Sequence, residues 1–234
     1  MGGIEDVDKM NSGRCKFSVP LFLTLHFFRD ETARGGPEQM ALDEALLESA
    51  EGPVLRIYRW DGPAVSFGYS QSLAEVGKIH PSTPAVRRWT GGGMVEHGRD
   101  LTFSLVVPGH EPLAKLRPVE TYRLIHESLA GLLSGVRLVG AGETTTGAAC
   151  FTAPALHDVA SADGRKLCGG AQRRTRRGFL HQGSLLGSAP PTVHLAAVFA
   201  ERVENRPESA RLEARTQELC AEKYANPAWQ ARIP

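Results

Sequence analysis

The chain has 234 residues, of which 41% are hydrophobic and 23% charged, so it can bury a substantial core and is neither disordered nor collagen-like. With 27 Lys and Arg against 26 Asp and Glu, its net charge is +1. This balance gives no general attraction to nucleic acid or to a membrane surface, and we expect neither as a partner. The four cysteines (Cys15, Cys150, Cys168 and Cys220) form no CxxC pair, which argues against a zinc site and favours free thiols.

Residues 1–19 have the composition of a loose leader. The apolar run from Phe17 to Phe28 that overlaps its end is too short to cross a bilayer. Acids as well as bases precede this run, whereas a signal peptide carries a plainly basic segment there. We therefore expect a cytoplasmic protein in which residues 20–234 form a single domain that begins with a buried strand.

Hydrophobic periodicity and turn residues divide the first half of the chain into short elements. They predict, in chain order, a strand at 21–28, a helix at 37–50, strands at 54–60 and 64–68 interpreted as a hairpin, a strand at 85–89 and a strand at 101–107.

The second half continues in the same mixed manner. The patterns predict a helix at 119–133, a strand at 136–139, a Gly- and Thr-rich loop at 140–149, a hairpin of 158–160 with 166–172, a strand at 183–186 and a polar helical tail from about 192. Because strands and helices do not alternate as βαβ units, we predict an α+β fold with a mixed, largely antiparallel sheet flanked by helices.

One segment joins two arginines to three successive glycines: Arg87, Arg88, Trp89, Thr90, Gly91, Gly92 and Gly93. A backbone without side chains can wrap around a ligand and present several N–H groups to it, and the arginines add fixed positive charge. This pattern favours binding of a phosphate, a carboxylate or a pantetheine-like chain, and the alternative is a flexible turn. The spacings GxxxxGK[ST] and GxGxxG are both missing, so the two familiar nucleotide loops are not supported.

A second segment places Lys166 two residues before Cys168, followed by Gly169 and Gly170. In a strand, Lys166 and Cys168 share one face, and the glycines let a ligand approach the backbone. The lysine is then a contact for a carbonyl or phosphate group. The alternative is a surface lysine whose stem lies along apolar atoms.

Three further features have both a chemical and a structural interpretation. Cys150 ends the Gly- and Thr-rich loop and is a candidate nucleophile or a small buried residue. His97 and His181 follow the two glycine segments and are either catalytic groups or hydrogen-bonding residues of the fold. A basic turn contains Arg173, Arg174, Arg176 and Arg177, which are either solvated or dock an acidic partner.

From about Leu25 to Leu186 the chain resembles the family of lipoate and octanoate protein transferases and ligases, which also includes biotin protein ligases. The arginine–glycine segment is similar to the family pattern RR-x-[ST]-GGG, with His97 after it. Residues 164–172 are similar to GRK-[IVL]-x-G-x-A-Q. Residues 181–186 resemble HG-[ST]-[IL]-L, although His181 and Gln182 stand in the order opposite to that of the cysteine-type octanoyltransferases. The resemblance implies the catalytic-domain fold of this family for residues 20–234.

The family contains two chemistries, and residues 150–154 bear on the choice because they resemble the CF-x-x-P motif of the cysteine-type octanoyltransferases. That resemblance implies transfer of an octanoyl group from acyl carrier protein, through a thioester on Cys150, to a lysine of a lipoyl domain or H protein, with no cofactor. The alternative is a lipoate–protein ligase that uses ATP and Mg²⁺. A second alternative is a non-catalytic module that binds an acylated partner.

The same resemblance implies two catalytic residues, Cys150 as nucleophile and Lys166 beside the acyl carbonyl, and no metal ligand. It implies that the acyl substrate is bound by Arg87, Arg88, Thr90, Gly91, Gly92, Gly93, His97, Gly169, Gly170, Ala171 and His181. The acidic carrier and lipoyl domains of the family are the partners expected at the basic turn.

Overall fold

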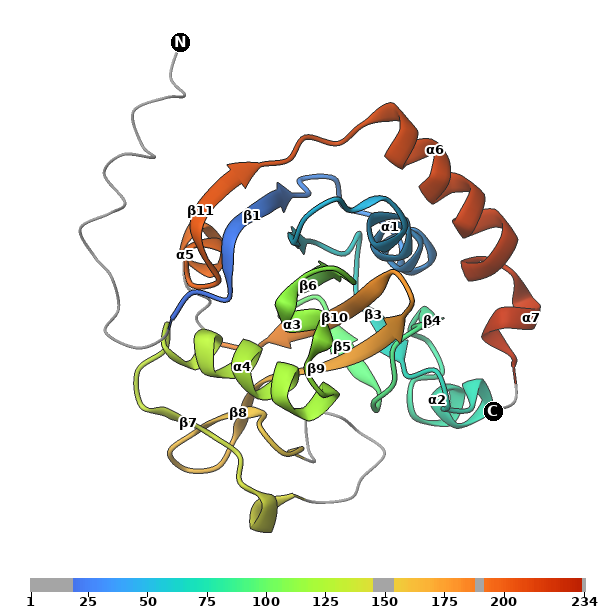
Figure 1. Cartoon of the computed structure of the whole chain (residues 1–234). Helices are drawn as coiled ribbons and strands as arrows, with labels where there is room; N and C mark the ends of the chain where they lie inside the picture. The colour runs from blue at the N-terminus through green and yellow to red at the C-terminus, as the bar shows by residue number, and fades with distance from the viewer. Residues whose placement is uncertain (1–18, 145–153, 188–191, 233–234) are drawn as a thin grey trace.

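In residues 19–144, 154–187 and 192–232, which the computed structural model describes, the chain builds an eight-stranded sheet (Figure 1). Its spatial order is β11 (Ala200–Asn205), β1 (Phe22–Arg29), β2 (Val54–Tyr58), β6 (Leu101–Pro108), β10 (Gly178–Leu185), β9 (Lys166–Thr175), β8 (Val159–Ser161) and β7 (Val136–Leu138). Strand β1 pairs in parallel with β11 and β2, and the remaining neighbours pair antiparallel. The prediction of a mixed, largely antiparallel sheet is confirmed.

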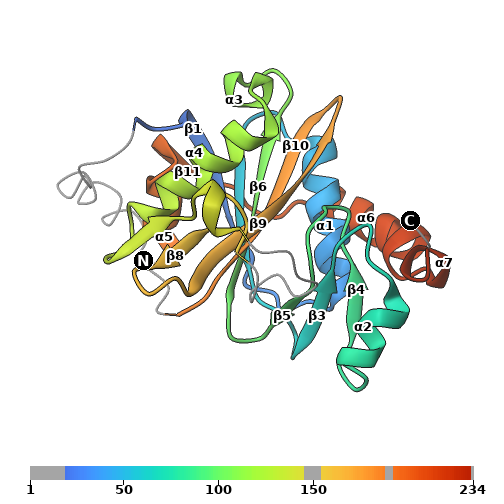
Figure 2. The same cartoon turned by 90° about the horizontal axis from the view of Figure 1, so that it is seen from below.

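A smaller sheet and two sets of helices surround this sheet (Figure 2). The smaller sheet has the order β4 (Ala85–Arg87), β3 (Ala64–Phe67) and β5 (Val95–His97). One face of the large sheet is covered by α3 (Pro112–Lys115), α4 (Pro118–Ala130) and α5 (Thr192–Ala197). The other face is covered by α1 (Gly36–Ser49) and α6 (Ala210–Leu219). Helices α2 (Leu73–Ile79) and α7 (Pro227–Gln230) contact β4. A short 3-10 helix occupies Ala141–Glu143, and a short π-helix occupies Cys220–Tyr224.

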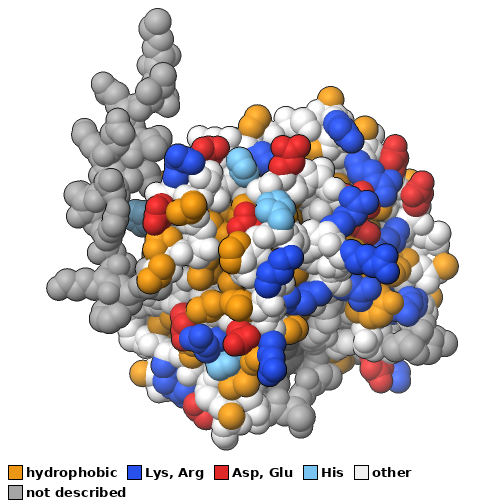
Figure 3. Space-filling view, in the orientation of Figure 1, with side chains coloured by type: hydrophobic (Ala, Val, Ile, Leu, Met, Phe, Trp, Pro, Cys, Tyr) orange, Lys and Arg blue, Asp and Glu red, His pale blue; other side chains and the backbone are white. Residues whose placement is uncertain are grey.

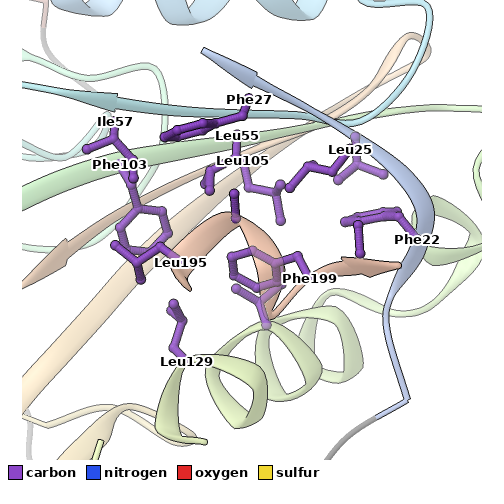
Figure 4. Close-up of a cluster of buried hydrophobic side chains, with 14 of the residues drawn as sticks. Phe22, Leu25, Phe27, Leu55, Ile57, Phe103, Leu105, Leu129, Leu195 and Phe199 are labelled. Atoms are coloured by element: carbon purple, nitrogen blue, oxygen red, sulfur yellow. The ribbon is translucent and has the colours of Figure 1, made fainter. Parts of the chain in front are cut away.

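The two faces of the central strands carry different side chains because successive residues point to opposite sides. On the α4 and α5 face, Leu55 is opposite Leu105, and Ile57 is opposite Phe103, in an apolar core that Figure 4 shows. On the α1 face, Arg56 is opposite Ser104. One face therefore holds the larger apolar core, and the other holds buried polar groups.

Helix α1 matches the helix predicted at 37–50. Pro37 stands in its first turn, where a missing N–H group costs no hydrogen bond. All residues from Gln39 to Leu47 are buried, because the helix lies between the large sheet and α6. This central position lets side chains of α1 reach the polar face of the sheet.

Some predicted elements were wrong or were missed. The interpretation of 54–60 and 64–68 as a hairpin is wrong, because β2 and β3 belong to different sheets and the turn between them carries the chain from one sheet to the other. The tail from 192 is helical only in part, because it also contains the edge strand β11. Most side chains of β11 are partly or fully exposed, so its sequence lacks the alternation that marks a half-buried strand. Helix α2 and strand β5 were not predicted, and β10 begins five residues before the predicted 183.

Within the part of the chain that the structure describes, no helix is both long enough and apolar enough to cross a membrane.

Candidate active site

A pocket lies where β9 and β10 of the large sheet meet the glycine loop and the small sheet. Its empty volume is about 450 Å³, including open solvent at its mouth, and apolar atoms form most of its wall. Its lining residues are Met40, Tyr58, Trp60, Ser66, Arg88, Val95, His97, Thr102, Lys166, Gly169, Gly170, Ala171, Gln182, Gly183 and Ser184. The structure thus brings Arg88 of the first glycine segment to the same pocket as the second segment, although the two lie more than 70 residues apart in the sequence. The other residues of the first segment that were predicted to bind substrate do not line this pocket: Arg87, Thr90, Gly91, Gly92 and Gly93.

Lys166, at the start of β9, lines the pocket although only 5% of its surface is exposed. Its Nζ atom lies 2.7 Å from Oδ2 of the buried Asp158. Asp158 also accepts hydrogen bonds from the Tyr122 hydroxyl (2.6 Å) and the Ala155 amide (2.7 Å). A side chain at Gly169 would come within 2.5 Å of Nζ, so it would displace the ammonium group from its present position. The alternative interpretation as a surface lysine is wrong.

Cys168, two residues further along β9, has different surroundings. It is fully buried in the apolar core, and this burial strongly raises the pKa of its thiol. A thiol that stays protonated is a poor nucleophile. Cys168 is therefore a packing residue.

The glycine loop follows β4 as predicted, and it leads into β5, a strand that the sequence did not predict. Arg88 holds the loop from within, because its guanidinium donates to the carbonyl oxygens of Gly91 and Gly93, both at 2.9 Å. Gly92 has φ = +85°, a conformation that residues with side chains rarely adopt. The Thr90 hydroxyl donates to Oε1 of Gln182 at 2.7 Å and so ties the loop to β10.

Arg87 points away from the pocket. Its guanidinium donates to backbone carbonyls, including those of Tyr69 (2.7 Å) and Arg232 (2.7 Å), and so fastens the C-terminal segment to the small sheet. The two adjacent arginines were predicted to bind substrate together. The structure places only Arg88 at the pocket, because alternate residues of a strand face opposite sides.

His97, at the end of β5, belongs to a buried hydrogen-bonded chain in the pocket wall. Its Nδ1 lies 2.9 Å from Oδ2 of Asp100, and its Nε2 lies 2.6 Å from the Ser66 hydroxyl. Arg88 also donates to that hydroxyl at 2.8 Å. Burial lowers the pKa of His97, and its hydrogen bond lowers the pKa of Asp100 against the opposing effect of burial. A neutral imidazole beside a carboxylate donates from Nδ1, so Nε2 accepts the Ser66 proton. Trp60 stacks on the ring at 4.0 Å.

The sequence predicts that His181 binds substrate, but the structure places its neighbour Gln182 at the pocket instead. His181 faces the opposite side of the sheet, where its ring packs beside Phe103, Tyr122 and His126. Gln182 faces the pocket, and its amide nitrogen donates to Oδ2 of Asp43 at 2.7 Å. The predicted role for His181 in substrate binding therefore has no support from its position. The alternation of β10 would have identified Gln182 had the whole strand been recognised.

Asp43 connects the pocket to a buried ionic cluster on the α1 face. Arg56 lies 2.7 Å from Asp43 and 2.6 Å from Asp30, and it also hydrogen-bonds to Gln39. The Tyr58 ring lies 4.0 Å from its guanidinium carbon. Each charge of Arg56, Asp30 and Asp43 has a partner of opposite sign. The cluster supports the pocket wall through the hydrogen bond between Asp43 and Gln182.

The basic turn is smaller than predicted, because Arg173 and Arg174 belong to β9 and the turn begins at Arg176. Arg174 lies against α4 and the Phe179 ring, and burial lowers its pKa. The predicted nucleophile Cys150 lies outside the described residues. Within residues 19–144, 154–187 and 192–232, no group of three or more His, Cys, Asp and Glu side chains is arranged to hold a metal ion.

Fold and pocket together place a buried lysine beside a largely apolar pocket, next to a glycine-rich loop. The sequence profile of the lipoyl protein ligase A/B catalytic domain matches residues 36–221, and the chain belongs to this family.

Curated relatives and solved structures agree with this assignment. Octanoyltransferase LipM of Geobacillus kaustophilus is 35% identical over 171 residues, covering 63% of this chain and 60% of that protein. The LipM of Kyrpidia tusciae is 34% identical over 191 residues, covering 71% and 68%. The chain thus spans only about 60–68% of these relatives.

Two solved structures are similar in fold. The first is a lipoate-protein ligase A bound with ATP, with a TM-score of 0.69 at 19% identity over 91% of this chain and 100% of that one. The second is a bi-partite lipoate protein ligase from Thermoplasma acidophilum, with a TM-score of 0.59 at 18% identity over 92% and 98%.

Proposed function

We propose that the chain moves an octanoyl group from acyl carrier protein, through a thioester on Cys150, to a lysine of a lipoyl domain or H protein. The observation that carries this proposal is the pocket, which joins an apolar wall to a buried lysine and a hydrogen-bonded glycine loop. The apolar wall suits an acyl chain. The CF-x-x-P motif at residues 150–154 and the similarity to octanoyltransferases favour transfer over ligation.

The reaction has two displacement steps. The Cys150 thiolate attacks the carbonyl carbon of the acyl thioester, a new C–S bond forms, and the carrier leaves as a thiolate that takes up a proton. The neutral amine of the acceptor lysine then attacks the same carbon and a C–N bond forms. The C–S bond to Cys150 breaks, and the proton that the nitrogen loses returns to the departing sulfur. A thioester is exchanged for a more stable amide, so the transfer needs no ATP.

Lys166 supplies positive charge to both steps. Its ammonium group stabilises the oxyanion that develops on the acyl oxygen, and it favours the thiolate form of a nearby cysteine. Asp158 holds the lysine in place, and Tyr122 and the Ala155 amide in turn hold Asp158. Arg88, which holds the glycine loop, and the Gly169–Ala171 segment form further parts of the pocket wall.

Mass spectrometry of the intact protein tests the proposal. The protein is incubated with octanoyl-acyl carrier protein in the absence of ATP, beside the variants Cys150→Ser and Lys166→Ala. We expect an added octanoyl mass that hydroxylamine removes and that Cys150→Ser abolishes. Cys220→Ser serves as the matched control, because Cys220 is a partly exposed cysteine that packs against the α1 cluster and lies outside the pocket lining, and it should retain the adduct.

Two other outcomes would replace the proposal. Acylation of a lipoyl domain from free lipoate, dependent on ATP and without an adduct on Cys150, would make the protein a ligase. Binding of acylated carrier without either reaction would make it a non-catalytic module.

A further inference from the structure

Cationic and aromatic side chains gather beside the glycine loop, outside the pocket. The guanidinium carbon of Arg173 lies 5.2 Å from the Tyr69 ring centre and 5.0 Å from that of Trp89. The guanidinium of Arg232 lies 4.1 Å from the same Tyr69 ring, and Lys223 lies 4.3 Å from Trp89. Figure 3 shows Lys and Arg side chains gathered on the right half of the face, where Figure 1 shows the turn that joins β9 to β10.

Among the described residues, only some of the cations in this cluster are paired with an acid. Lys223 forms an ion pair with Glu44 at 2.6 Å. Within the described part of the chain, by contrast, the side chains of Arg173 and Arg232 form neither an ion pair nor a hydrogen bond. Nε of Arg173 and Nη1 of Arg232 are buried without a partner, although each residue as a whole is partly exposed. Stacking on aromatic rings therefore positions both guanidinium groups and leaves their donors unused.

A neighbouring arginine adds to this excess of positive charge. Arg87 donates to the backbone carbonyl of Arg232. Burial and then the charge of Arg232 lower the pKa of Arg87. Neighbouring like charges disfavour each other, so a bound anion would be stabilised by this cluster.

The cluster adjoins the mouth of the pocket. Arg173 follows Ala171 by two residues on β9, so it projects from the sheet face on which Ala171 lines the pocket. Along the strand, Arg173 lies roughly 13 Å beyond Gly169, which contacts Lys166. Trp89 directly precedes Thr90 of the glycine loop. An extended chain that enters the pocket at Ala171 therefore passes Arg173, whose guanidinium shares the Tyr69 ring with that of Arg232.

We propose that Arg173 and Arg232, stacked on Tyr69 and Trp89, bind the phosphate of the phosphopantetheine arm that delivers the acyl group. This inference rests on the proposed function, because it assumes a thioester donor whose carbonyl lies at Lys166. The planar guanidinium presents forked N–H donors that fit phosphate oxygens. The arm then runs from a basic anchor, along β9, to the reacting carbon in the apolar pocket.

Binding measurements that require no catalysis test this site. Two analogues of the donor are compared, octanoyl-aminopantetheine with and without its phosphate, in which an amide replaces the thioester. By calorimetry, the phosphorylated analogue should bind the unaltered protein about tenfold more tightly than the other, the size of one charge-assisted contact. The double variant Arg173→Gln, Arg232→Gln should lose that difference while binding the unphosphorylated analogue as before.

One control variant and two contrary outcomes complete the test of the phosphate site. Arg176→Gln alters an exposed cation of the neighbouring turn and should retain the preference for phosphate. Equal binding of the two analogues by the unaltered protein would overturn the inference. So would a double variant that weakens only octanoyl-acyl carrier protein, because the arginines would then contact acids of the carrier. Failure of the proposed function is separate, since it appears as the missing adduct on Cys150.

Discussion

Arg56 and Lys166 are both buried cations in strands of the same sheet, yet their surroundings differ. Arg56 is enclosed by Asp30, Asp43 and Gln39, and it lies outside the pocket lining. Lys166 pairs with Asp158 and forms part of the wall of a pocket. Burial of a charge is costly in both places, and a surrounding cluster of partners offsets that cost for Arg56.

This difference separates a structural ion cluster from a candidate catalytic one. A cation whose donors all bind protein atoms can stabilise the fold, but it has no donor available for a substrate. A cation beside an apolar pocket can stabilise negative charge on a reacting group. We therefore expect substitutions of Arg56 to affect stability first and substitutions of Lys166 to affect transfer first.

The largest effect should come from Arg56→Met. The substitution leaves Asp43 without a cation and leaves Asp30 with only Arg34, at 3.4 Å, and both carboxylates are at most 1% exposed. The free energy of unfolding should fall by about 3–5 kcal/mol. Denaturant titration measures this loss. Arg29→Met removes an exposed arginine paired with Glu31 and should change the unfolding free energy by less than about 1 kcal/mol. Similar losses of unfolding free energy in both variants would show that the buried cluster stabilises the fold no more than an exposed ion pair does.

Lys166→Met should reduce octanoyl transfer by roughly 10²–10³-fold, because charge stabilisation of the oxyanion is lost. It should also reduce stability, since Asp158 is left buried without its ammonium partner. The double variant Lys166→Met, Asp158→Asn removes both charges. It should regain stability and remain inactive in a single-turnover assay, whereas recovery of transfer in the double variant would exclude a catalytic role for the lysine.

A smaller effect is expected where the glycine loop is tied to β10. Thr90→Val removes the hydrogen bond to Gln182 and leaves a buried amide oxygen without that donor, at a cost of about 1–3 kcal/mol. Thermal unfolding measures the change. Thr24→Val, at a threonine on β1 whose hydroxyl accepts from Arg202 near the surface, should cost less than about 0.5 kcal/mol. An equal cost at the two sites would show that the loop does not depend on this tie.

Acid should weaken the fold through buried histidines on the α4 face of the sheet. Burial lowers the pKa of His126 to about 3, against about 6.5 in the unfolded chain. The unfolded chain therefore binds a proton first as the pH falls. The stability from neutral His126 is complete above pH 6.5 and is lost progressively toward pH 3, by about 1.4 kcal/mol at pH 5.5.

Unfolding measured between pH 5 and pH 8 tests this dependence. His126→Asn should flatten the profile by that amount, and His110→Asn, at an exposed histidine, should leave it unchanged. A profile that His126→Asn does not alter would contradict the expected protonation. His181 adds to the same trend, since burial places its pKa well below the usual value.

Much of the fold could be predicted because the sheet is patterned locally. Alternating apolar residues mark β1, β2 and β6, and a helical stripe marks α4. The edge strand β11 escaped prediction because its partner β1 lies more than 170 residues away and its exposed side chains are polar. The false hairpin of β2 and β3 has a similar cause, since a turn shows that the chain reverses but not which strand it pairs with.

The pocket was predictable in outline and not in detail. The glycine loop, His97 and Lys166 have local signatures, and the structure brings them together. The directions of Arg87 and His181 depend on strand register, which the sequence left open. Asp158 could not be identified as the partner of Lys166, because the pairing of β8 with β9 contains an irregularity between Val159 and Ala160.

The most direct test measures single-turnover octanoyl transfer and denaturant unfolding on the same preparations of Arg56→Met and of the double variant Lys166→Met, Asp158→Asn. We predict that the Arg56 variant loses stability, and that the fraction still folded transfers octanoate at a rate within about tenfold of the unaltered protein. The Lys166 double variant should unfold near the unaltered protein and transfer at least about 100-fold more slowly. Loss of transfer that follows loss of stability in both variants would contradict a catalytic role for Lys166.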